Sequence, residues 1–480
     1  MSMDNVIPGE ACDSQGDEML GKAVAEPFSF RPPAPELPST SLPILRLIWA
    51  VFFNPLLVWR RQHFEDPIVV ERTLLGTRLV VSDPLLVKRI LVDNAQNYVR
   101  DSLQQRLLYR VTGRGVFSAE GSDWKIQRQT LAHGFSARAL DAYIPGMAAA
   151  AEDAVNRFRA SEEGAFDLGR EMSILTVDVI GRTVFCGRLG ESPTRIADNI
   201  RQFSDANGPV EVGDLLGLPS WLPGVRRLGG WRATALVRQR ARRILAEGKA
   251  SVPSSKIGFL SALFSARNAE TGKPLGDRNI EDNISTLVGA GSDTVAVALT
   301  WAIFLLSQAP HAREAVESEV DAHLTDQEPT AETLGKLVWT RAVVEEAMRL
   351  YPPAPMIGRM IRGEDRLGSE LFRSGTTILI SPWVLHRHAL LWEHPDRFEP
   401  ERFLPGRREL IPRYAYLPFG AGPRVCLGMG FAMQEAVIVL ATLIKNLCFE
   451  RADDQPIRLR QCVTLQTEAP IRMRARPRQT

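Results

Sequence analysis

The clearest chemical signal in this sequence is a short stretch near the C-terminal end, residues 419–428, which reads FGAGPRVCLG. Gly420, Gly422 and Pro423 favour a tight loop over a helix or a strand. The apolar, proline-free run that follows is long enough for a buried helix. We therefore predict that Cys426 lies at or just before a helix N-terminus, where free amides and the helix dipole favour a thiolate over a thiol.

A lone thiolate suits one kind of metal chemistry better than others. Without a second cysteine or histidine nearby, Cys426 makes a poor zinc site. It suits the axial position on a metal that a macrocycle already holds. Phe419 would shield the sulfur from water, and Gly428 and Ala432 would leave a flat surface where a planar group could lie. The alternative is a buried structural cysteine beside a core helix.

A second unusual stretch, GAGSDT at residues 289–294, lies in the middle of a predicted helix. The segment from Glu281 to Ser307 is apolar nearly all round, which indicates a buried helix, and Asp277 is placed to cap it. Each glycine inside a helix costs about 1 kcal/mol relative to alanine. Ala290 and Gly291 are therefore expected where something flat approaches the helix closely.

Asp293 and Thr294 end this stretch. Burying such polar side chains in an apolar helix costs free energy unless they form hydrogen bonds or serve a function. An alcohol backed by a carboxylate that reaches solvent can supply protons one at a time to a site that is otherwise dry. We therefore interpret Thr294 and Asp293 as candidate catalytic residues. The alternative is a glycine-kinked structural helix whose threonine bonds its own backbone.

The segment GSDWKIQRQTL places Trp124 and Arg128 four residues apart, on one face of a predicted helix. An indole N–H and a guanidinium that point the same way suit an anionic group. The alternative is a tryptophan packed on an arginine stem.

Glu346 and Arg349 share a helical face three residues apart, and the later segment FEPERF offers Arg402 from a proline-bearing loop. A carboxylate between two guanidiniums is a satisfied buried network, and removing one partner would strand a charge. We expect a structural role for these three residues. The alternative is a surface salt bridge.

Taken together and in this order, these motifs resemble those of the cytochrome P450 haem-thiolate monooxygenases, over roughly residues 40 to 470. The resemblance implies that Thr294 hydrogen-bonds dioxygen and that Asp293 relays protons toward it. Val295 departs from the family pattern, in which a second hydroxyl residue is frequent. The residues that the resemblance assigns to haem binding, with Cys426 as the axial iron ligand, are Trp124, Arg128, Ala290, Gly291, Arg359, Phe419, Gly422, Arg424, Cys426 and Gly428.

The resemblance also implies a fold and a reaction. The fold would be a single mainly α domain with a small β region (α+β) around buried heme b (iron protoporphyrin IX). The reaction would insert one atom of dioxygen into an apolar small-molecule substrate, by hydroxylation or epoxidation. Because the sequence shows no flavin or iron–sulfur domain, electrons would come from a separate ferredoxin- or flavodoxin-type donor with its reductase. The rival functions are a haem-thiolate isomerase or dehydratase and a non-catalytic haem-binding sensor.

Composition sets the remaining expectations. The chain has 480 residues, 45% of them hydrophobic, and a formal net charge of +2, which gives no indication of nucleic-acid binding. Its five cysteines show no metal or disulfide spacing, which fits a reducing compartment. The first residues lack the apolar core of a signal peptide, so we expect a cytoplasmic protein.

Three segments are expected along the chain: a flexible, acidic and then proline-rich segment at 1–40, the catalytic domain at 41–469 and a basic tail at 470–480. Residues 42–59 form the one candidate membrane stretch, but its clean apolar run is far shorter than the ~20 residues of a span. We predict a short helix there that packs on the body or rests on a membrane surface. The basic run from Arg226 to Arg243 is either a solvated helix face or a weak contact with an anionic membrane.

Overall fold

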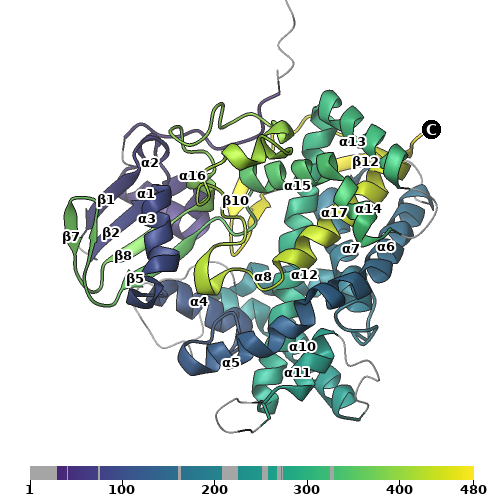
Figure 1. The fold of residues 1–480 in the computed structure, drawn as a ribbon, viewed down its shortest axis with the longest axis horizontal. Helices are drawn as coiled ribbons and strands as arrows, with labels where there is room; N and C mark the ends of the chain where they lie inside the picture. The colour runs from purple at the N-terminus through teal and green to yellow at the C-terminus, as the bar shows by residue number, and fades with distance from the viewer. Residues whose placement is uncertain are drawn as a thin grey trace, which may run out of the picture.

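Helices form most of this chain, with the largest sheet at one side of the body and smaller sheets elsewhere, as the computed structural model shows (Figure 1). The predicted mainly α fold with a small β region is therefore confirmed. The structure describes residues 30–479 except for 41, 74–75, 161–163, 208–224, 251–257, 268–271, 273 and 325–328. The irregular sequence of residues 195–230 suggests a role in substrate specificity, but residues 208–224 of this segment lie outside the described part of the chain.

The described helices vary from single turns to one element that crosses the whole body. Their bounds are α1 (Ile44–Phe53), α2 (Arg61–Glu65), α3 (Pro84–Lys88), α4 (Ser102–Thr112), α5 (Gly121–Ala132), α6 (Ala137–Ala160), α7 (Leu168–Arg182), α8 (Pro193–Asn207), α10 (Val225–Ala250), α11 (Phe259–Ser265), α12 (Asp277–Gln308), α13 (Pro310–His323), α14 (Ala331–Lys336), α15 (Val338–Leu350), α16 (Pro382–Leu385) and α17 (Met429–Asn446).

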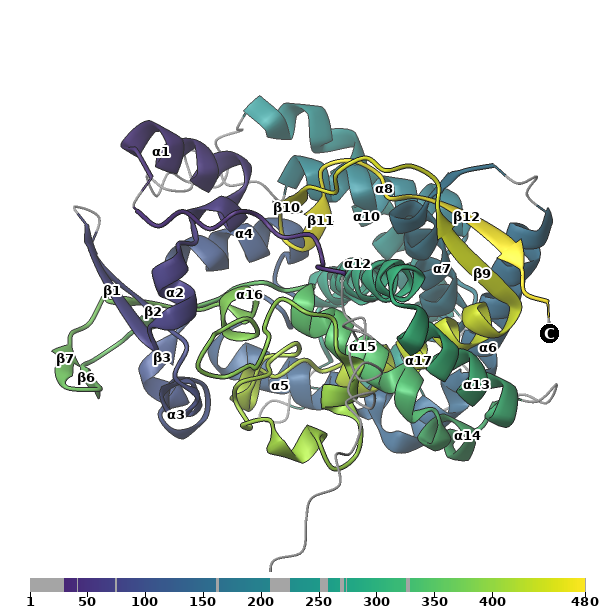
Figure 2. The same ribbon diagram turned by 90° about the horizontal axis from the view of Figure 1, so that it is seen from above.

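Helix α12 runs through the middle of the helical part, where Figure 2 shows it nearly end-on. It contacts α7, α10, α15 and α17, so nearly all of its C-terminal half is buried. The helix starts at Asp277, earlier than the predicted Glu281, and Gly276 takes the N-cap position. Asp277 does not cap the helix because its carboxylate binds Lys249 Nζ at 2.7 Å. As an acid in the first turn it still complements the helix dipole.

The largest sheet has five strands in the order β1-β2-β8-β5-β3. Strands β1 and β2 form a hairpin around Gly76, in which they pair antiparallel with Ile68 opposite Val81. The strand β8 then adds parallel to β2. The bounds are β1 (Ile68–Thr73), β2 (Gly76–Val81), β3 (Tyr98–Val99), β5 (Ile357–Ile361) and β8 (Thr377–Ile380).

Three smaller sheets complete the β region. One contains three strands in the order β4-β12-β9, and the other two are hairpins, β6-β7 and β10-β11. The β10-β11 hairpin matters for function because its turn reaches the middle of α12. The bounds are β4 (Phe166–Asp167), β6 (Asp365–Leu367), β7 (Glu370–Phe372), β9 (Leu447–Arg451), β10 (Leu459–Gln461), β11 (Leu465–Thr467) and β12 (Arg472–Pro477).

Both ends of the described chain lie against the body. Near the N-terminus, the hydroxyl of Tyr351 donates to the carbonyl of Pro33 at 2.8 Å. The backbone amide of Arg61 donates to the carbonyl of Pro38 at 3.2 Å. At the C-terminus, residues 472–477 of the expected basic tail form strand β12. Its arginines point outward while Met473 is fully buried, so alternation lets a basic segment pair as a strand.

The predicted short helix in residues 42–59 is present as α1, and it leaves apolar side chains on the surface. Leu45 is 78% exposed and Trp49 is 50% exposed. Among the described residues one helix, α12, is long and apolar enough to cross a membrane. In its most apolar window 67% of the residues are buried inside the protein, as in the core helix of a globular body.

Candidate functional site

Cys426 is carried by a loop whose backbone demands glycine. Gly420 and Gly422 have φ values of +70° and +71°, in the region that other residues rarely adopt. At Gly422 a Cβ atom would also overlap the carbonyl oxygen of Leu91. The amide of Cys426 donates to the carbonyl of Phe419 at 2.9 Å, which closes the loop. The loop geometry predicted from the sequence is therefore confirmed.

The thiol of Cys426 faces a cavity of about 330 Å³, which we call the large cavity; it lies between α12 and the cysteine loop. Helix α17 starts at Met429, with Gly428 as its N-cap, so the cysteine just precedes a helix as predicted. Burial raises the pKa of the Cys426 thiol, whereas the amide of Gly428 and the guanidinium of Arg128 lower it.

The net direction of that pKa differs from the sequence expectation. The helix-end amide acts in the predicted sense, but desolvation outweighs it and the pKa rises. A thiolate at Cys426 therefore needs a cation at the sulfur itself, and a metal ion supplies one.

Small or flat side chains form the wall of the large cavity beside the sulfur. Gly428 and Ala432 both line it. A Cβ atom at Gly428 would meet no protein atom closer than Phe135, at 3.8 Å, so the missing side chain leaves free space on the cavity side. Phe419 lines the large cavity and also a pocket on the opposite side of the loop. Its ring therefore lies between the sulfur and the outside.

The predicted anion-binding side chains meet at one edge of the large cavity. Trp124 and Arg128 project from α5, Arg359 comes from β5, and Arg424 comes from the cysteine loop. The guanidinium of Arg424 lies 4.1 Å from the centre of the Trp124 ring, and that of Arg128 lies 5.9 Å from it. Arg100, which the sequence analysis missed, joins them.

This edge of the large cavity carries more positive than negative charge. Burial lowers the pKa of Arg359, Arg424 and Arg100 to about 10 each. Among the described residues, Glu120 is the acid that pairs with this cluster, 2.5 Å from Arg424 and 3.6 Å from Arg100. Desolvated guanidiniums in excess over carboxylates form a site for a ligand that brings its own carboxylates.

Helix α12 forms the wall opposite Cys426. Ala290 and Thr294 line the large cavity, and Gly291 lies between them. A Cβ atom at Gly291 would come 2.8 Å from Cδ1 of Ile180 on α7. The missing side chain at Gly291 therefore lets α7 approach α12, in addition to leaving the cavity wall flat.

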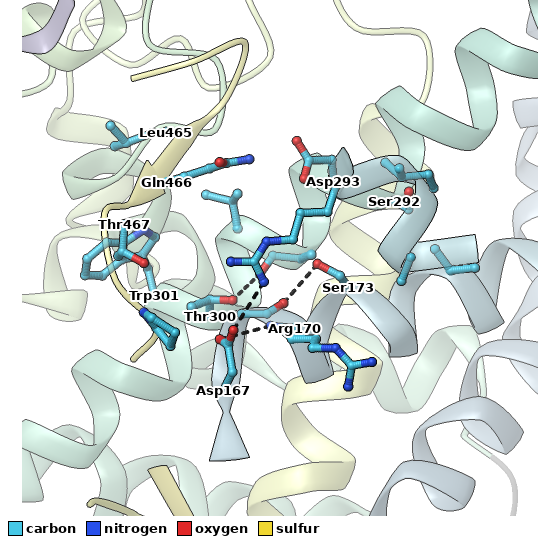
Figure 3. Close-up of a pocket in the computed structure, with 18 residues that line it drawn as sticks. Asp167, Arg170, Ser173, Ser292, Asp293, Thr300, Trp301, Leu465, Gln466 and Thr467 are labelled. Atoms are coloured by element: carbon cyan, nitrogen blue, oxygen red, sulfur yellow. Dashed lines mark hydrogen bonds and ion pairs between the residues drawn. The ribbon is translucent and has the colours of Figure 1, made fainter. Parts of the chain in front are cut away.

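The candidate catalytic pair is split between two cavities. Thr294 lines the large cavity, and its hydroxyl donates to the carbonyl of Ala290 at 2.8 Å. Asp293 instead lines a second cavity of about 90 Å³ behind the helix, which we call the small cavity (Figure 3). There its Oδ2 accepts a hydrogen bond of 2.7 Å from the hydroxyl of Thr464, in the turn of the β10-β11 hairpin. Burial raises the pKa of Asp293.

The three predicted structural residues form a buried ionic cluster. Glu346 and Arg349 on α15 are both fully buried and are joined by two hydrogen bonds of 2.6 and 2.8 Å. Arg402 lies 3.7 Å from Glu346, but its shorter ion pair, at 2.6 Å, joins it to Glu399. The surface salt bridge that the sequence left open is therefore excluded.

Arg349 ties this cluster to the segment that leads toward the cysteine loop. Its guanidinium donates to the carbonyl oxygens of His386, Pro395 and Arg397, each within 2.8 Å. In the same segment, His386 accepts a hydrogen bond from the amide of Leu417 at 2.8 Å. The cluster therefore supports the backbone two residues before Phe419.

No sequence pattern marks two of the residues at these cavities, Arg100 and Thr464. Arg100 belongs to no recognisable motif, and its role in the charged edge depends on chain segments far away. Thr464 lies 171 residues from Asp293, and a threonine in a hairpin turn carries no chemistry by itself. Only the tertiary fold brings either residue to the site.

The residues present fit a haem on three independent observations. The thiol of Cys426 faces the large cavity with its pKa raised by desolvation, and a metal cation at the sulfur would favour the thiolate. Flat walls enclose the space beside it. The desolvated arginines at one edge lack carboxylates that propionates would supply.

Comparison with known proteins agrees with this geometry. Residues 50–474 match the family model described as "Cytochrome P450". The chain is 32% identical over 395 residues to "Cyclooctatin synthase" of Streptomyces melanosporofaciens, covering 82% of this chain and 85% of that protein. It is 32% identical over 411 residues to "Cyclooctat-9-en-7-ol 5-monooxygenase" of the same organism, covering 84% and 87%. It is 26% identical over 414 residues to "Pentalenene oxygenase" of Streptomyces avermitilis, covering 85% and 89%.

Proposed function

This chain belongs to the cytochrome P450 family, and from that premise we propose that it hydroxylates or epoxidises a terpenoid hydrocarbon in the large cavity. As a member of the family it is an oxidoreductase of the monooxygenase class. One atom of dioxygen enters the substrate and the other leaves as water. The balance requires two electrons and two protons from outside the substrate.

We propose heme b as the cofactor, held by residues from four chain segments. Cys426 would ligate the iron from the cysteine loop. Trp124, Arg128, Arg359 and Arg424 bind the two propionates, with Arg100 beside them. When bound, the haem activates dioxygen and transfers one of its atoms to the substrate. The excess of buried guanidiniums over carboxylates at this edge is the observation that supports this assignment.

Two side chains of α12, those of Thr294 and Asp293, transfer protons. Thr294 presents its hydroxyl to the large cavity and, in the resting state, is bound to the carbonyl of Ala290. It can turn from that carbonyl and donate a hydrogen bond to dioxygen. Asp293 collects protons from solvent and replaces those that Thr294 gives up, as a general acid does. The haem-thiolate isomerase would need no such pair.

The substrate is apolar because the polar side chains of the large cavity are already used. Asn283 donates to Gln127 and Asn279 and accepts from the amide of Val116, each at 2.8 Å. Thr286 donates to the carbonyl of Asp282 at 2.6 Å. The side chains left to contact substrate are apolar, namely Leu108, Leu287, Ala298, Val344, Met348, Met356 and Ile357. The printed names of the relatives, which concern cyclooctatin and pentalenene, favour a cyclic terpenoid.

Electrons come from a separate ferredoxin- or flavodoxin-type protein that docks on the cysteine side. Phe419 and Met429 line a pocket on that face, and Met429 is 46% exposed. The protein works in the cytoplasm, and the apolar face of α1 rests on a membrane from which an apolar substrate can enter. Co-sedimentation with lipid vesicles should be detectable for the wild type and should be reduced for the double variant Trp49→Ser and Leu45→Ser.

The experiment for the main proposal is a terpenoid screen followed by turnover. The haem-loaded protein is titrated with cyclic terpene hydrocarbons, and binding is detected as a spin-state shift of the haem. Compounds that bind are then incubated with a surrogate ferredoxin, its reductase and NADPH. We expect a mono-oxygenated product whose added oxygen comes from labelled dioxygen. Binding without oxygenated product under oxygen would instead support the non-catalytic sensor.

A further inference from the structure

The small cavity lies on the opposite side of α12 from the large one, and the two share no lining residue. Residues 291, 294, 295 and 298 line the large cavity, while residues 292, 293, 296, 297 and 300 line the small one. At about 90 Å³ the small cavity has room for several water molecules. It is an independent space that could supply protons without opening the substrate side.

Three polar side chains form a hydrogen-bonded row at this cavity. The amide of Gln466 donates to the hydroxyl of Thr464 at 3.3 Å, and that hydroxyl donates to Oδ2 of Asp293 at 2.7 Å. Figure 3 shows Gln466 and Asp293 on facing walls of the space. The Thr464 hydroxyl thus accepts from one neighbour and donates to the other, so its proton is aimed at the carboxylate.

The charged groups around Asp293 are mostly committed to other partners. Arg201 on α8 pairs with Asp167 at 3.3 Å, and Arg170 on α7 pairs with Asp198 at 3.0 Å. Asp205 on α8, which pairs with Arg460 of β10 at 3.6 Å, opposes a negative charge at Asp293, and Arg201 favours one. Cys462 in the hairpin turn is the remaining titratable neighbour.

Among the described residues, Thr464 is therefore the hydrogen-bond donor that holds the Asp293 carboxyl in the small cavity. This differs from the fully buried Glu346, which is bound by Arg349 and by a backbone amide at the same time. A single neutral donor orients a carboxylate and leaves it free to take up and release a proton.

We propose that Thr464 is a positioning residue for proton delivery, which holds Asp293 toward the small cavity so that it is reprotonated there by water. This proposal rests on the proposed function of Asp293. In each cycle the Asp293 carboxylate takes a proton from water in the small cavity. The acid then turns from Thr464 and gives that proton to the hydroxyl oxygen of Thr294, whose own proton passes into the large cavity. Asp293 returns as a carboxylate to the hydrogen bond from Thr464.

Two consequences follow from removing the Thr464 hydroxyl. The carboxylate loses a hydrogen bond that favours its charged form, so Asp293 holds its proton more tightly. It also loses the group that orients it toward water. The first effect slows the transfer of the proton from Asp293 to Thr294, and the second slows its renewal from water. Neither changes a residue that lines the large cavity.

The test compares Thr464→Val, which keeps the shape and removes the hydroxyl, with Thr464→Ser, which keeps the hydroxyl. The first measurement is an infrared pH titration of the substrate-free holoprotein, in which the Asp293 carboxyl band is identified by its loss in Asp293→Asn. We expect the midpoint to rise by about one pH unit in Thr464→Val and to stay near the wild-type value in Thr464→Ser. A midpoint that is the same in Thr464→Val and wild type would overturn the proposal.

The second measurement is the fraction of electrons that end in product, together with its solvent deuterium isotope effect. Thr464→Val should lower that fraction several-fold and raise the isotope effect, and Thr464→Ser should restore both. If Thr464→Ser shows the same loss of coupling and the same isotope effect as Thr464→Val, Thr464 acts through packing and the proposal fails. Gln466→Leu, which removes the donor to Thr464, should give a smaller change in the same direction.

Failure of this proposal is distinguishable from failure of the proposed function. The infrared midpoint requires neither substrate nor redox partner, so it tests the Thr464–Asp293 bond even if no terpenoid is oxidised. Conversely, a protein that turns over substrate with an unchanged midpoint in Thr464→Val would keep its function and lose this positioning role.

Discussion

Two carboxylates, those of Glu346 and Asp293, show how differently the same functional group can be used in one protein. Glu346 receives two hydrogen bonds from Arg349 and one from the backbone amide of Glu399 at 2.9 Å, with Arg402 3.7 Å away. Among the residues that the structure describes, Thr464 is the one donor to Asp293, which borders a cavity. A carboxylate saturated by cations fixes a loop in place. One with a single neutral donor and access to water suits proton transfer.

The largest expected effect is the loss of stability on removing Glu346, the carboxylate that is saturated by hydrogen bonds. Glu346→Ala leaves the fully buried Arg349 without its carboxylate, which should cost about 3–5 kcal/mol of unfolding free energy. Chemical denaturation and haem content measure it. The control is Glu370→Ala, because Glu370 is 50% exposed and its pair with Arg72 is solvated. That variant should lose less than about 1 kcal/mol. Equal losses in the two variants would contradict a special role for the buried cluster.

The next effect concerns the loop that the cluster supports. In Gly422→Ala the φ value of +71° costs about 1–2 kcal/mol, and the overlap of Cβ with Leu91 adds about 1–3 kcal/mol. The matched control is Gly406→Ala, where φ is +86° and no atom lies within 4 Å of the new Cβ. Haem incorporation and thermal stability should both fall in the first variant far more than in the second. Equal losses of haem incorporation and stability in the two variants would mean that the backbone at Leu91 shifts at little cost to accommodate the new Cβ.

Substitutions at Thr294 and Asp293 should change catalysis and leave the stability of the fold unchanged. Thr294→Ala should bind haem and substrate normally while diverting electrons to hydrogen peroxide. Asp293→Asn should lower turnover by about 10²-fold, the usual contribution of a general acid. The control is Thr176→Val, because Thr176 also bonds a carbonyl one turn back, that of Met172, but lines neither cavity. Undiminished coupling in Thr294→Ala would refute its role.

The smallest expected effect is the pH dependence of stability that comes from a buried base, His386. Burial lowers the pKa of His386 to about 3, from an ordinary value near 6.5. The unfolded chain therefore binds a proton that the folded protein does not, and stability is lost as the pH falls from about 6.5 toward 3. Between pH 7 and pH 5 this residue should account for about 2 kcal/mol. Urea unfolding at both pH values should show a smaller pH-dependent loss for His386→Asn than for the wild type. An identical loss in both would contradict a neutral buried imidazole.

Local patterns carried the part of the site that was predictable from sequence. The loop glycines before Cys426 and the Glu346–Arg349 spacing act over a few residues, so their geometry could be predicted without the fold. The direction of the Cys426 pKa could not, because desolvation depends on everything that surrounds the sulfur. The separation of Asp293 from Thr294 into two cavities, and the partner Thr464, depend on how the β10-β11 hairpin packs on α12.

Long-range pairing explains the other differences in the same way. The basic residues 472–477 look like a tail in isolation, yet they pair with β9 and β4 because Met473 finds a buried position. Arg402 was expected to bind Glu346 closely, but the nearer carboxylate is Glu399, in the same loop. Spacing along the chain identifies which charges meet, and packing decides how closely.

The most direct test of the account is the absorption spectrum of the reduced, carbon monoxide-bound protein. With the Cys426 thiolate on the iron, the wild type should show the strongly red-shifted Soret band of a haem-thiolate protein, stable near neutral pH. Cys426→Ala should lose that band, while Cys448→Ala, at a cysteine remote from the large cavity, should keep it. Survival of the red-shifted band in Cys426→Ala, or its absence from active wild-type protein, would contradict the central claim.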